Sequence, residues 1–560
     1  MTGSFVVTGV PIRTRHDRPA VEALAVRDGV VAAAGDLADA RAAVPPGTEE
    51  LLLDHGAVMP AFIDAHQHAF LVAIDPHTDV LYRRGHDISG LLTELAALVA
   101  IASDQAGAAA DTGPAVNEPS SPWLRFHGYE PLTLAEHRSP TAAELDTVCA
   151  DRPLHVISRT YHESTVNSAG LAELGISNAT PDPPGGRIVK DRRGRPTGVL
   201  LEAASFAAEA ASRPTDPTGG WRARLADHGR RLTSLGIARI GDAAVPIEAA
   251  DDMVEILRDV GIGVTPLLTG KRIDEPGIIP HGTAKVLADG GEYCHLCMTS
   301  RQVRTVMKTS TRASFGPERG LARAMGRRAG FPKREPDGAW HTGIRFPEEA
   351  ALPQILRIAA QSGSGLAVHA IGNGAVEAVL SAVAADTGLA ADVAVRVEHA
   401  MAIDTELIAL LARHHLPVVA QPGFITAFGH ELNLTPVPPP LQLMPFRTML
   451  DAGIPLTFSS DYPAAELTPW AGVAAAVNRI DSHGLPVGPE QSVTVAEALT
   501  AYTTTAAETL GLTDAGTLEP GRRADLMWCD RDPHASEIGD LASIRVLGTW
   551  VDGRRVFDGR

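Results

Sequence analysis

The sequence predicts an α/β protein built on a (β/α)8 TIM barrel, and three observations support this fold class. Apolar runs of strand length alternate with helical patterns along most of the 560 residues. These runs are nearly continuous in apolar residues, as expected for buried parallel strands. Several runs end in histidine or aspartate, and barrel enzymes carry their active sites at the carboxyl ends of their strands.

Nine segments have the pattern of barrel strands, one more than a closed eight-stranded barrel holds. They are 57–66, 154–162, 237–244, 263–270, 284–290, 365–372, 393–400, 416–423 and 454–461. The interval between the first and third segments is far longer than a normal βα connection. We therefore assign 154–162 to a subdomain of about residues 72–220, inserted after the first barrel strand.

Short sequence patterns predict one loop and the first residues of two helices. Residues 107–122 are rich in Ala, Gly, Pro and Ser and are expected to form a mobile loop within the insertion. Thr141 with Glu144, and Thr494 with Glu497, match capping boxes that begin helices.

Both ends of the chain contain short strand patterns joined by tight turns. The sequence RDG before VVAAAG predicts a hairpin near the amino end, and Asp552-Gly553 predicts another near the carboxyl end. We expect the two ends, 1–56 and 513–560, to meet in one small β domain beside a barrel of residues 57–512.

Composition narrows the function classes. The net charge of −18 argues against nucleic-acid binding, which needs a basic surface. The amino end lacks the pattern of a signal peptide, and no run of about 18 apolar residues predicts a transmembrane helix. Four cysteines do not make a disulfide framework. The expectation is a cytoplasmic protein that binds a small molecule, not nucleic acid or membrane.

The clearest chemical signal is Asp64-Ala-His66-Gln-His68, at the end of the first barrel strand. Alternate residues of a strand point to the same side, so His66 and His68 can face one metal ion. The alternative, more common for an isolated motif of this kind, is a pair of solvated loop histidines.

Three further polar residues stand at the ends of other predicted barrel strands: His369, His399 and Asp461. Each alone could be a capping residue or a hydrogen-bonded core residue. Their shared position predicts a metal site with one or two ions. Histidine and carboxylate ligands suit zinc, with manganese or iron(II) as alternatives.

For the other candidate residues, an ordinary structural role is the favoured interpretation. A protonated Lys285 cannot ligate a metal, because ammonium groups only donate, whereas a neutral lysine can form an anionic carbamate that bridges two metals. From the residues alone, a salt-bridged barrel lysine is favoured. Cys294 and Cys297 could form a redox pair or half of a zinc site, but no second CxxC follows, so ordinary pocket or packing residues are expected. Asp242 is expected to be structural.

Several motifs resemble the amidohydrolase superfamily, and within it amidohydrolase family 3, the N-substituted formamide deformylase-like metal-dependent hydrolases. MPAFIDAHQH resembles the family signature PGFIDxHxH. The other matching segments follow in family order along nearly the whole chain: 165–176, 181–204, AKVLADGG, 368–376, 396–400, 459–463 and 516–530. The resemblance is specific for the family and much less specific for a substrate.

The resemblance implies a distorted barrel with a composite β-sandwich from both termini, and a divalent-metal centre. The implied ligands are His66 and His68 at one metal, with Asp461 beside it, and His369 and His399 at a second. Lys285 would be a carboxylated bridge, on the resemblance alone.

His162 lies in YHESTVNS, where the family also has a histidine. The insertion could bring it over the barrel mouth as a catalytic substrate contact or oxyanion donor, and a structural histidine is the equal alternative. Asn373 replaces the usual aspartate near His369, which removes a carboxylate and is expected to alter the surroundings of that ligand. Residues 292–304 depart from the family pattern, so we expect a different pocket wall.

The predicted reaction is hydrolysis of a non-peptide amide-type C–N bond of a small molecule by metal-activated water. Asp461 would accept the proton from that water and pass it to the leaving amine. A cyclic amide, carbamate or ester would fit the same site, and a deaminase is a further alternative. A non-catalytic binding protein and a metal-storage protein are the competing non-enzymes. A homodimer is the default expectation for assembly.

Overall fold

The computed structural model describes residues 3–75, 87–107, 122–213, 220–269, 282–336, 338–434 and 437–559. The predicted mobile loop at 107–122 lies outside these residues, except for its two end residues. None of the described helices has both the length and the apolar character needed to cross a membrane.

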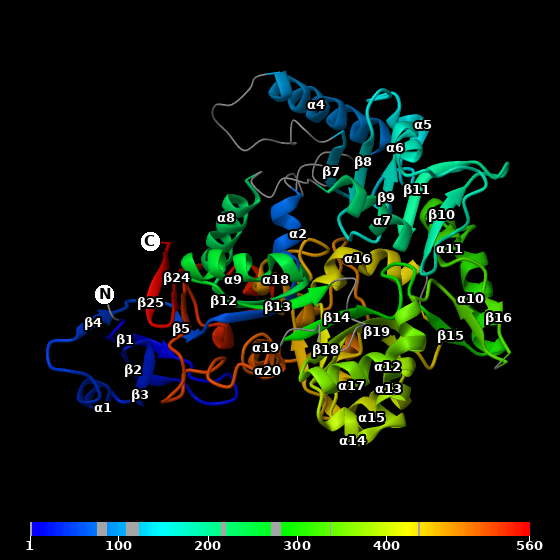
Figure 1. The fold of residues 1–560 in the computed structure, drawn as a ribbon. Helices are drawn as coiled ribbons and strands as arrows, with labels where there is room; N and C mark the ends of the chain where they lie inside the picture. The colour runs from blue at the N-terminus through cyan, green and yellow to red at the C-terminus, as the bar shows by residue number, and fades with distance from the viewer. Residues whose placement is uncertain are drawn as a thin grey trace.

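Eight parallel strands form a nearly closed barrel at the centre of the molecule (Figure 1). In sheet order they are β6 (Phe62–Gln67), β12 (Ile237–Pro246), β13 (Gly263–Thr269), β14 (Thr283–Leu287), β18 (Gly365–Gly372), β19 (Val395–Ile403), β20 (Val418–Ala420) and β22 (Leu456–Phe458). The short β21 (Gln442–Leu443) pairs antiparallel with β19. Eight of the nine predicted segments each overlap one barrel strand, which confirms the barrel prediction.

The gap between β22 and β6 is bridged by the residues that follow β22. The Asp461 backbone N–H donates to the carbonyl oxygen of His66 at 2.8 Å. The Ser460 backbone N–H donates to the carboxylate of Asp64 at 2.9 Å. The last predicted strand end is therefore held against the first.

The first predicted strand, 57–66, is in fact two strands. β5 (Ala57–Pro60) belongs to a different sheet, and β6 begins the barrel. Pro60 has no N–H to continue a strand ladder. The next N–H groups donate to different elements, Ala61 to the Asp525 carbonyl at 3.0 Å and Phe62 to the Gly236 carbonyl at 2.8 Å.

Helices surround the barrel, and most of them pack on the outer faces of its strands (Figure 1). They are α2 (Ala69–Ile74), α8 (Trp221–Ser234), α9 (Ala250–Asp259), α12 (Pro347–Ser362), α13 (Asn373–Ala385), α14 (Thr387–Ala391), α15 (Thr405–Arg413), α16 (Gly423–Leu434), α17 (Phe446–Asp451), α18 (Pro469–Asn478), α19 (Val495–Ala501) and α20 (Thr504–Thr509).

Helix α12 illustrates how the sequence sets these helices. Pro347 opens it, where a missing N–H costs nothing, and Glu348 and Glu349 complement the helix dipole. Gly363 ends it in the left-handed region, at φ 64°. One face is buried against the barrel core, through Leu352, Ile355, Leu356, Ile358 and Ala359.

Strands from both ends of the chain pair in one eight-stranded sheet beside the barrel, and the two termini lie near each other in Figure 1. Its members are β1 (Phe5–Ile12), β2 (Val21–Arg27), β3 (Val30–Gly35), β4 (Glu49–Leu52), β5, β23 (Leu526–Cys529), β24 (Val546–Val551) and β25 (Arg554–Asp558). Helix α1 (Leu37–Ala42) packs against β2 and β3. Both predicted hairpins are confirmed, with positive φ at Asp28, Gly29, Asp552 and Gly553.

A five-stranded sheet, separate from the barrel sheet, forms from the predicted insertion and lies above the barrel in Figure 1. The insertion contains α4 (Ile88–Gly107), β7 (Leu124–Tyr129), α5 (Ala142–Leu145), β8 (Leu154–Ser158), β9 (Glu163–Val166), α6 (Ser168–Glu173), β10 (Gly186–Lys190), β11 (Pro196–Glu202) and α7 (Ala203–Ser212). Candidate segment 154–162 contributes β8 to this sheet and not to the barrel. Both predicted capping boxes, at Thr141 and Thr494, are present.

A second excursion, not expected from the sequence, separates β14 from β18. It contains β15 (Leu296–Met298), α10 (Ser300–Ala313), α11 (Arg319–Ala329), β16 (Lys333–Arg334) and β17 (Trp340–Thr342), with the strands in a three-stranded sheet. It includes residues 292–304, where the sequence departs from the family pattern.

Candidate active site

One cavity of about 710 Å³ opens among the carboxyl ends of the barrel strands. All the predicted site residues line it: His66, His68, His162, Lys285, His369, His399 and Asp461. Lys285 comes from within β14, and His162 comes from the insertion. The structure therefore brings together residues that lie almost 400 positions apart in the sequence.

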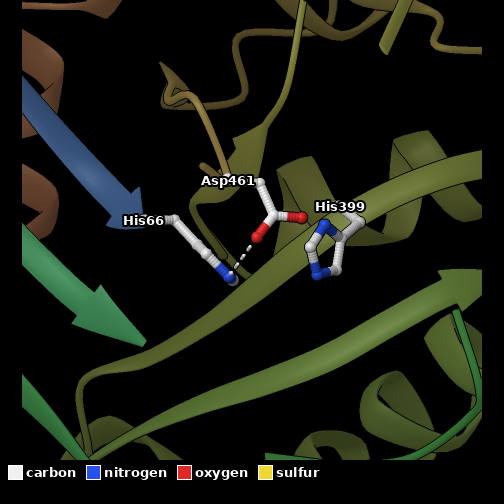
Figure 2. A group of neighbouring side chains, drawn as sticks. All are labelled: His66, His399 and Asp461. Carbon is white, nitrogen blue, oxygen red and sulfur yellow. Dashed lines mark ion pairs between the residues drawn. The ribbon is translucent and has the colours of Figure 1, made fainter. Parts of the chain in front are cut away.

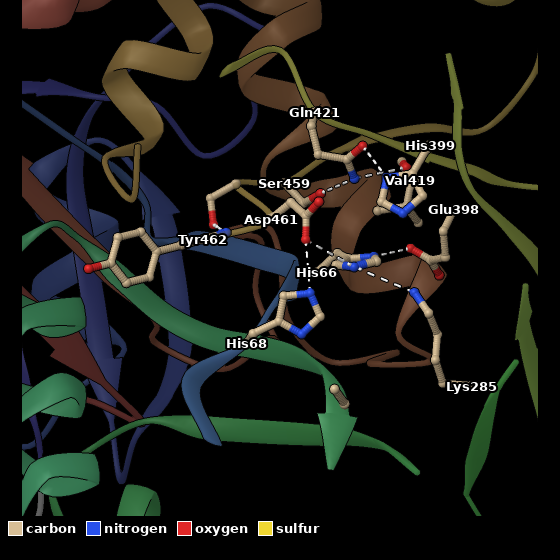
Figure 3. Close-up of polar contacts among 12 residues, drawn as sticks. His66, His68, Lys285, Glu398, His399, Val419, Gln421, Ser459, Asp461 and Tyr462 are labelled. Atoms are coloured by element: carbon tan, nitrogen blue, oxygen red, sulfur yellow. Dashed lines mark hydrogen bonds and ion pairs between the residues drawn. The ribbon is translucent and has the colours of Figure 1, made fainter. Parts of the chain in front are cut away.

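Asp461 lies between the two histidines of the first strand (Figure 3). Its Oδ1 is 3.0 Å from Nε2 of His68 and 3.4 Å from Nε2 of His66. Burial raises the pKa of the Asp461 carboxyl, but the neighbouring imidazoles outweigh burial and hold the pKa well below its usual value. Asp461 is therefore a carboxylate at neutral pH.

His66, His399 and Asp461 form a tighter group, in which one possible ligand atom from each lies within 4.8 Å of the others (Figure 2). The resemblance places His66 and His399 at two different metals. The side chains that the resemblance assigns to the two metals therefore lie in one cluster.

The tautomers of two histidines follow from their partners. His66 donates from Nδ1 to Oε2 of Glu398 at 2.5 Å, and His399 donates from Nδ1 to Oε1 of Gln421 at 2.8 Å. The Gln421 amide is oriented by its own donation to Ser459 Oγ at 3.0 Å. The neutral His399 ring therefore carries a lone pair on Nε2, as a metal ligand requires, and Nε2 of His66 is the atom that faces Asp461.

The donor set fits a divalent cation. Among the described residues, the buried Nε2 atoms of His369 and His399 have no hydrogen-bond partner. Burial lowers the pKa of His399 to about 3 and holds the pKa of His369 well below its usual value, so both rings are neutral. Unpartnered imidazole nitrogens beside a carboxylate are the ligands that zinc prefers.

Lys285 points at the same centre. Its Nζ lies 3.5 Å from Nε2 of His66, and burial lowers its pKa to about 8. Across the described ranges no salt bridge includes Lys285, so the salt-bridged lysine expected from the residues alone does not form. A lysine with a lowered pKa has a larger neutral fraction at neutral pH, the form that reacts with carbon dioxide.

His162 reaches the cavity from the insertion, and its ring centre is 5.3 Å from that of His369. Its Nδ1 lies 2.6 Å from Oε2 of Glu202. Burial lowers the pKa of His162, but the Glu202 carboxylate outweighs burial and raises it to about 9. The charged ring donates from Nδ1 to Glu202, so Nε2 is the atom left for the cavity.

A family model described as the amidohydrolase family matches residues 53–557. The chain belongs to this family. It is similar to the N-substituted formamide deformylase of Arthrobacter pascens, with 30% identity over 562 residues, 98% of this chain and 97% of that protein. As a member, this amidohydrolase is a metal-dependent hydrolase.

Two solved structures share the fold of this amidohydrolase. A metal-dependent hydrolase from Pyrococcus horikoshii OT3 has a TM-score of 0.66 and 21% identity, covering 96% of this chain and 99% of that one. A metal-dependent hydrolase from Pyrococcus furiosus has a TM-score of 0.61 and 22% identity, covering 95% and 99%.

Three buried acids support the site and were not singled out from the sequence. Glu398 orients His66 and accepts from Arg396 Nε at 2.6 Å. Glu202 holds His162. Asp289 accepts from the backbone N–H groups of Ile371 and Gly372, both at 2.9 Å, which fixes the end of β18 just after His369. Glu398 precedes a predicted ligand in RVEHA, and that adjacency was the available signal.

The remaining candidates of the amidohydrolase have structural contacts. Asp242 accepts from the backbone N–H of Phe70 at 2.7 Å, in the first turn of α2, as expected of a structural residue. Cys294 and Cys297 are not joined by a disulfide, and Cys294 lines the cavity. Asn373 accepts from the Cys297 N–H at 3.0 Å and donates to the Cys297 carbonyl at 2.8 Å, a two-way contact that aspartate cannot make.

The cavity wall above the polar centre is mostly apolar. Contributing side chains come from the barrel, the insertion and the second excursion: Leu132, Phe206, Met298, Met401, Phe424 and Phe428. A small apolar group bound there would bury surface against these side chains while its polar bond faces the histidines.

Proposed function

We propose that this amidohydrolase cleaves a non-peptide amide-type C–N bond of a small molecule with metal-activated water. The observation that carries the proposal is the pair of unpartnered, neutral imidazole nitrogens, on His369 and His399, beside the Asp461 carboxylate. Zinc is favoured by this donor set, with manganese or iron(II) as alternatives, in one or two ions.

A divalent metal at this centre would lower the pKa of water and polarise a carbonyl group. His66, His68, His369, His399 and Asp461 would hold it. Asp461 also lies where it can accept a proton from water and return it to the leaving amine. The apolar wall favours a substrate with an apolar substituent and excludes bulk water from the reacting bond.

We further propose two supporting roles. Lys285 is carboxylated, so that an anionic group replaces the ammonium beside His66. His162 donates a hydrogen bond from Nε2 to the substrate oxygen, because Glu202 holds Nδ1 and keeps the ring charged. Both roles use side chains that face the same cavity.

The deciding experiment combines metal content with a substrate screen. The purified enzyme is assayed on N-formyl and N-acyl amines, cyclic amides, carbamates and esters, with and without a chelator. Release of an amine that stops on metal removal supports the proposal. Activity that survives complete metal removal, or ammonia release from heterocycles without any amide cleavage, would overturn it in favour of another mechanism or a deaminase.

The relative from Arthrobacter pascens makes N-formyl amines the first compounds to test. A His369→Ala variant is the matched control, because it removes one proposed ligand and leaves the apolar wall intact. Activity of that variant equal to the parent enzyme would count against the centre described here.

We also propose the division into a composite β-sandwich domain, residues 1–56 and 513–560, and a barrel of 57–512. The shared sheet of β1–β5 with β23–β25 supports it. Since β5 pairs in that sheet, the boundary is better drawn after Pro60. The four free thiols, at Cys149, Cys294, Cys297 and Cys529, support a reducing compartment such as the cytoplasm.

A further inference from the structure

A second group of metal-ligating side chains lies outside the active-site cavity. His430 belongs to α16, and Asp481 and His483 belong to the turn that follows α18. One possible ligand atom from each lies within 4.8 Å of the others. We propose that His430, Asp481 and His483 bind a divalent transition metal of the zinc class, at a site separate from the catalytic centre.

The strongest observation is a pair of polar atoms without partners. Asp481 is 4% exposed, and its Oδ2 is buried with no hydrogen-bond partner among the described residues. The buried Nδ1 of His430 lacks a partner in the same part of the chain. Buried polar atoms in native proteins are nearly always paired, so an unpaired carboxylate oxygen and imidazole nitrogen in one cluster point to a cation that binds both.

The Asp481 side chain is held in place before any metal binds. Its Oδ1 accepts from the backbone N–H groups of His483 at 2.9 Å and Leu485 at 2.8 Å. The turn is closed by the Asp481 N–H, which donates to the Leu485 carbonyl at 2.9 Å. One carboxylate oxygen is therefore occupied, and Oδ2 is left for a ligand.

Helix α16 approaches this turn closely because residue 429 is glycine. A Cβ on Gly429 would lie 2.9 Å from Cβ of Asp481, closer than real Cβ contacts. The next residue is His430, whose ring centre is 4.0 Å from that of His483. The glycine thus brings the two imidazoles and the carboxylate together.

The ligand chemistry favours zinc. Two imidazoles and one carboxylate form the three-protein-ligand set of many zinc sites, with a position left for water. His483 is exposed, so its side chain can rotate inward and an ion can enter from solvent. Calcium and magnesium prefer all-oxygen ligands and do not suit this group.

A metal bound at this site would restrain a helix that lines the active-site cavity. Phe424 and Phe428 of α16 line the active-site cavity, and His430 lies on the same helix. A metal on His430 and Asp481 would tie this cavity wall to the turn after α18. The site would therefore restrain α16 without touching the reacting bond.

The test is a titration of Zn²⁺ into the metal-loaded enzyme, followed by calorimetry and by metal analysis after gel filtration. The parent enzyme should hold one more zinc per chain than His430→Ala and His483→Ala. His55→Ala is the matched control, because His55 is an exposed histidine whose Nδ1 lies 2.6 Å from Asp54 Oδ1, and within the described part of the chain it belongs to no group of three possible ligands.

Zinc should also raise the unfolding temperature of the parent and of His55→Ala more than that of His483→Ala, since it binds the folded site. His483 is exposed, so its replacement should not disturb folding even if His430→Ala does. The proposal is overturned if His483→Ala keeps the parent's zinc content and its zinc-induced shift. It is equally overturned if His55→Ala loses as much zinc as His483→Ala, which would indicate binding to surface imidazoles.

Discussion

Nδ1 of His66 and Oε2 of Glu398 lie 2.5 Å apart, and both side chains are fully buried in the barrel. The carboxylate fixes the ring orientation and the tautomer, so that Nε2 of His66 faces Asp461. A residue that hydrogen-bonds to a metal ligand, without binding the metal itself, affects the affinity of the site for the metal.

Glu398→Gln is therefore expected to weaken metal binding by about 10- to 100-fold. The amide keeps the shape but loses the charge that favours a donating Nδ1. Affinity is measured by competition with a chelator, and Glu248→Gln, at an exposed position, is the control. Equal affinities for the two variants would show that Glu398 does not orient the ligand.

Asp461→Asn should reduce turnover by about 10²-fold or more, the usual scale of general acid–base catalysis. Metal content should fall less than in His66→Ala, because an amide oxygen can still coordinate. Both quantities are measured on purified variants with a confirmed substrate. Near-normal turnover at full metal occupancy would show that another group moves the proton, and His162 would be the next to test.

Lys285→Ala should lose metal, and a short carboxylic acid added to the variant should restore part of the activity. The reason is that the acid supplies the anionic group that a carboxylated lysine would place beside His66. Retained metal in Lys285→Ala would favour a centre without a lysine bridge.

Gly291→Ala should displace His162. A Cβ at this position would lie 2.5 Å from the His162 ring, and the ring cannot easily move because Glu202 holds it. We expect lower turnover with unchanged metal content, because no proposed ligand is touched. Gly539→Ala, which meets no atom within 4 Å, is the control. Equal turnover of the two variants would argue against a catalytic role of His162.

Asp75 and Arg125 form a buried ion pair, with Arg125 Nε 2.5 Å from Oδ1 and Nη2 2.8 Å from Oδ2. The pair joins the end of α2 to the first strand of the insertion. Asp75→Asn leaves Arg125 charged and buried, so it should lower the free energy of unfolding by roughly 3–5 kcal/mol. Urea unfolding measures this change, with the exposed Asp392→Asn as control.

The same pair predicts a pH dependence. Burial raises the pKa of Asp75, but the Arg125 charge and hydrogen bonds outweigh burial and hold the pKa below its usual value. A carboxyl with a lowered folded-state pKa stabilises the fold above its unfolded value, about 3.9, and loses that contribution as the pH falls through the folded-state pKa. The difference between parent and Asp75→Asn should be constant near neutral pH and shrink in acid. A difference that grows in acid would contradict the assignment.

The strand ends were predictable because a buried strand gives a run of apolar residues, and a site residue interrupts or ends that run with a polar side chain. The segment 365–372 is apolar apart from His369, and it is β18 with the same limits. The assignment of 154–162 to an insertion rested on the strand count and the connection length, and β8 indeed pairs outside the barrel.

Other features depend on contacts that are distant in sequence. Glu202 and Glu398 give no periodic signal, because a single buried acid is justified only by its partner. The break within 57–66 was missed, because continuous apolar residues conceal a change of sheet at Pro60. The cluster of His430, Asp481 and His483 was also missed. Its members are about 50 residues apart in the sequence, and nothing in the sequence of the turn that holds Asp481 and His483 marks them as ligands.

The sheet shared by both ends of the chain has a consequence for biosynthesis. In the finished protein Met59 of β5 lies opposite Met527 of β23. During translation, β5 leaves the ribosome long before β23 is made, and its pairing edge has no native partner in the interval. An unpaired apolar edge invites association with other chains. We therefore expect nascent chains that stall before β23 to depend on chaperones, although most of the barrel has already been synthesised.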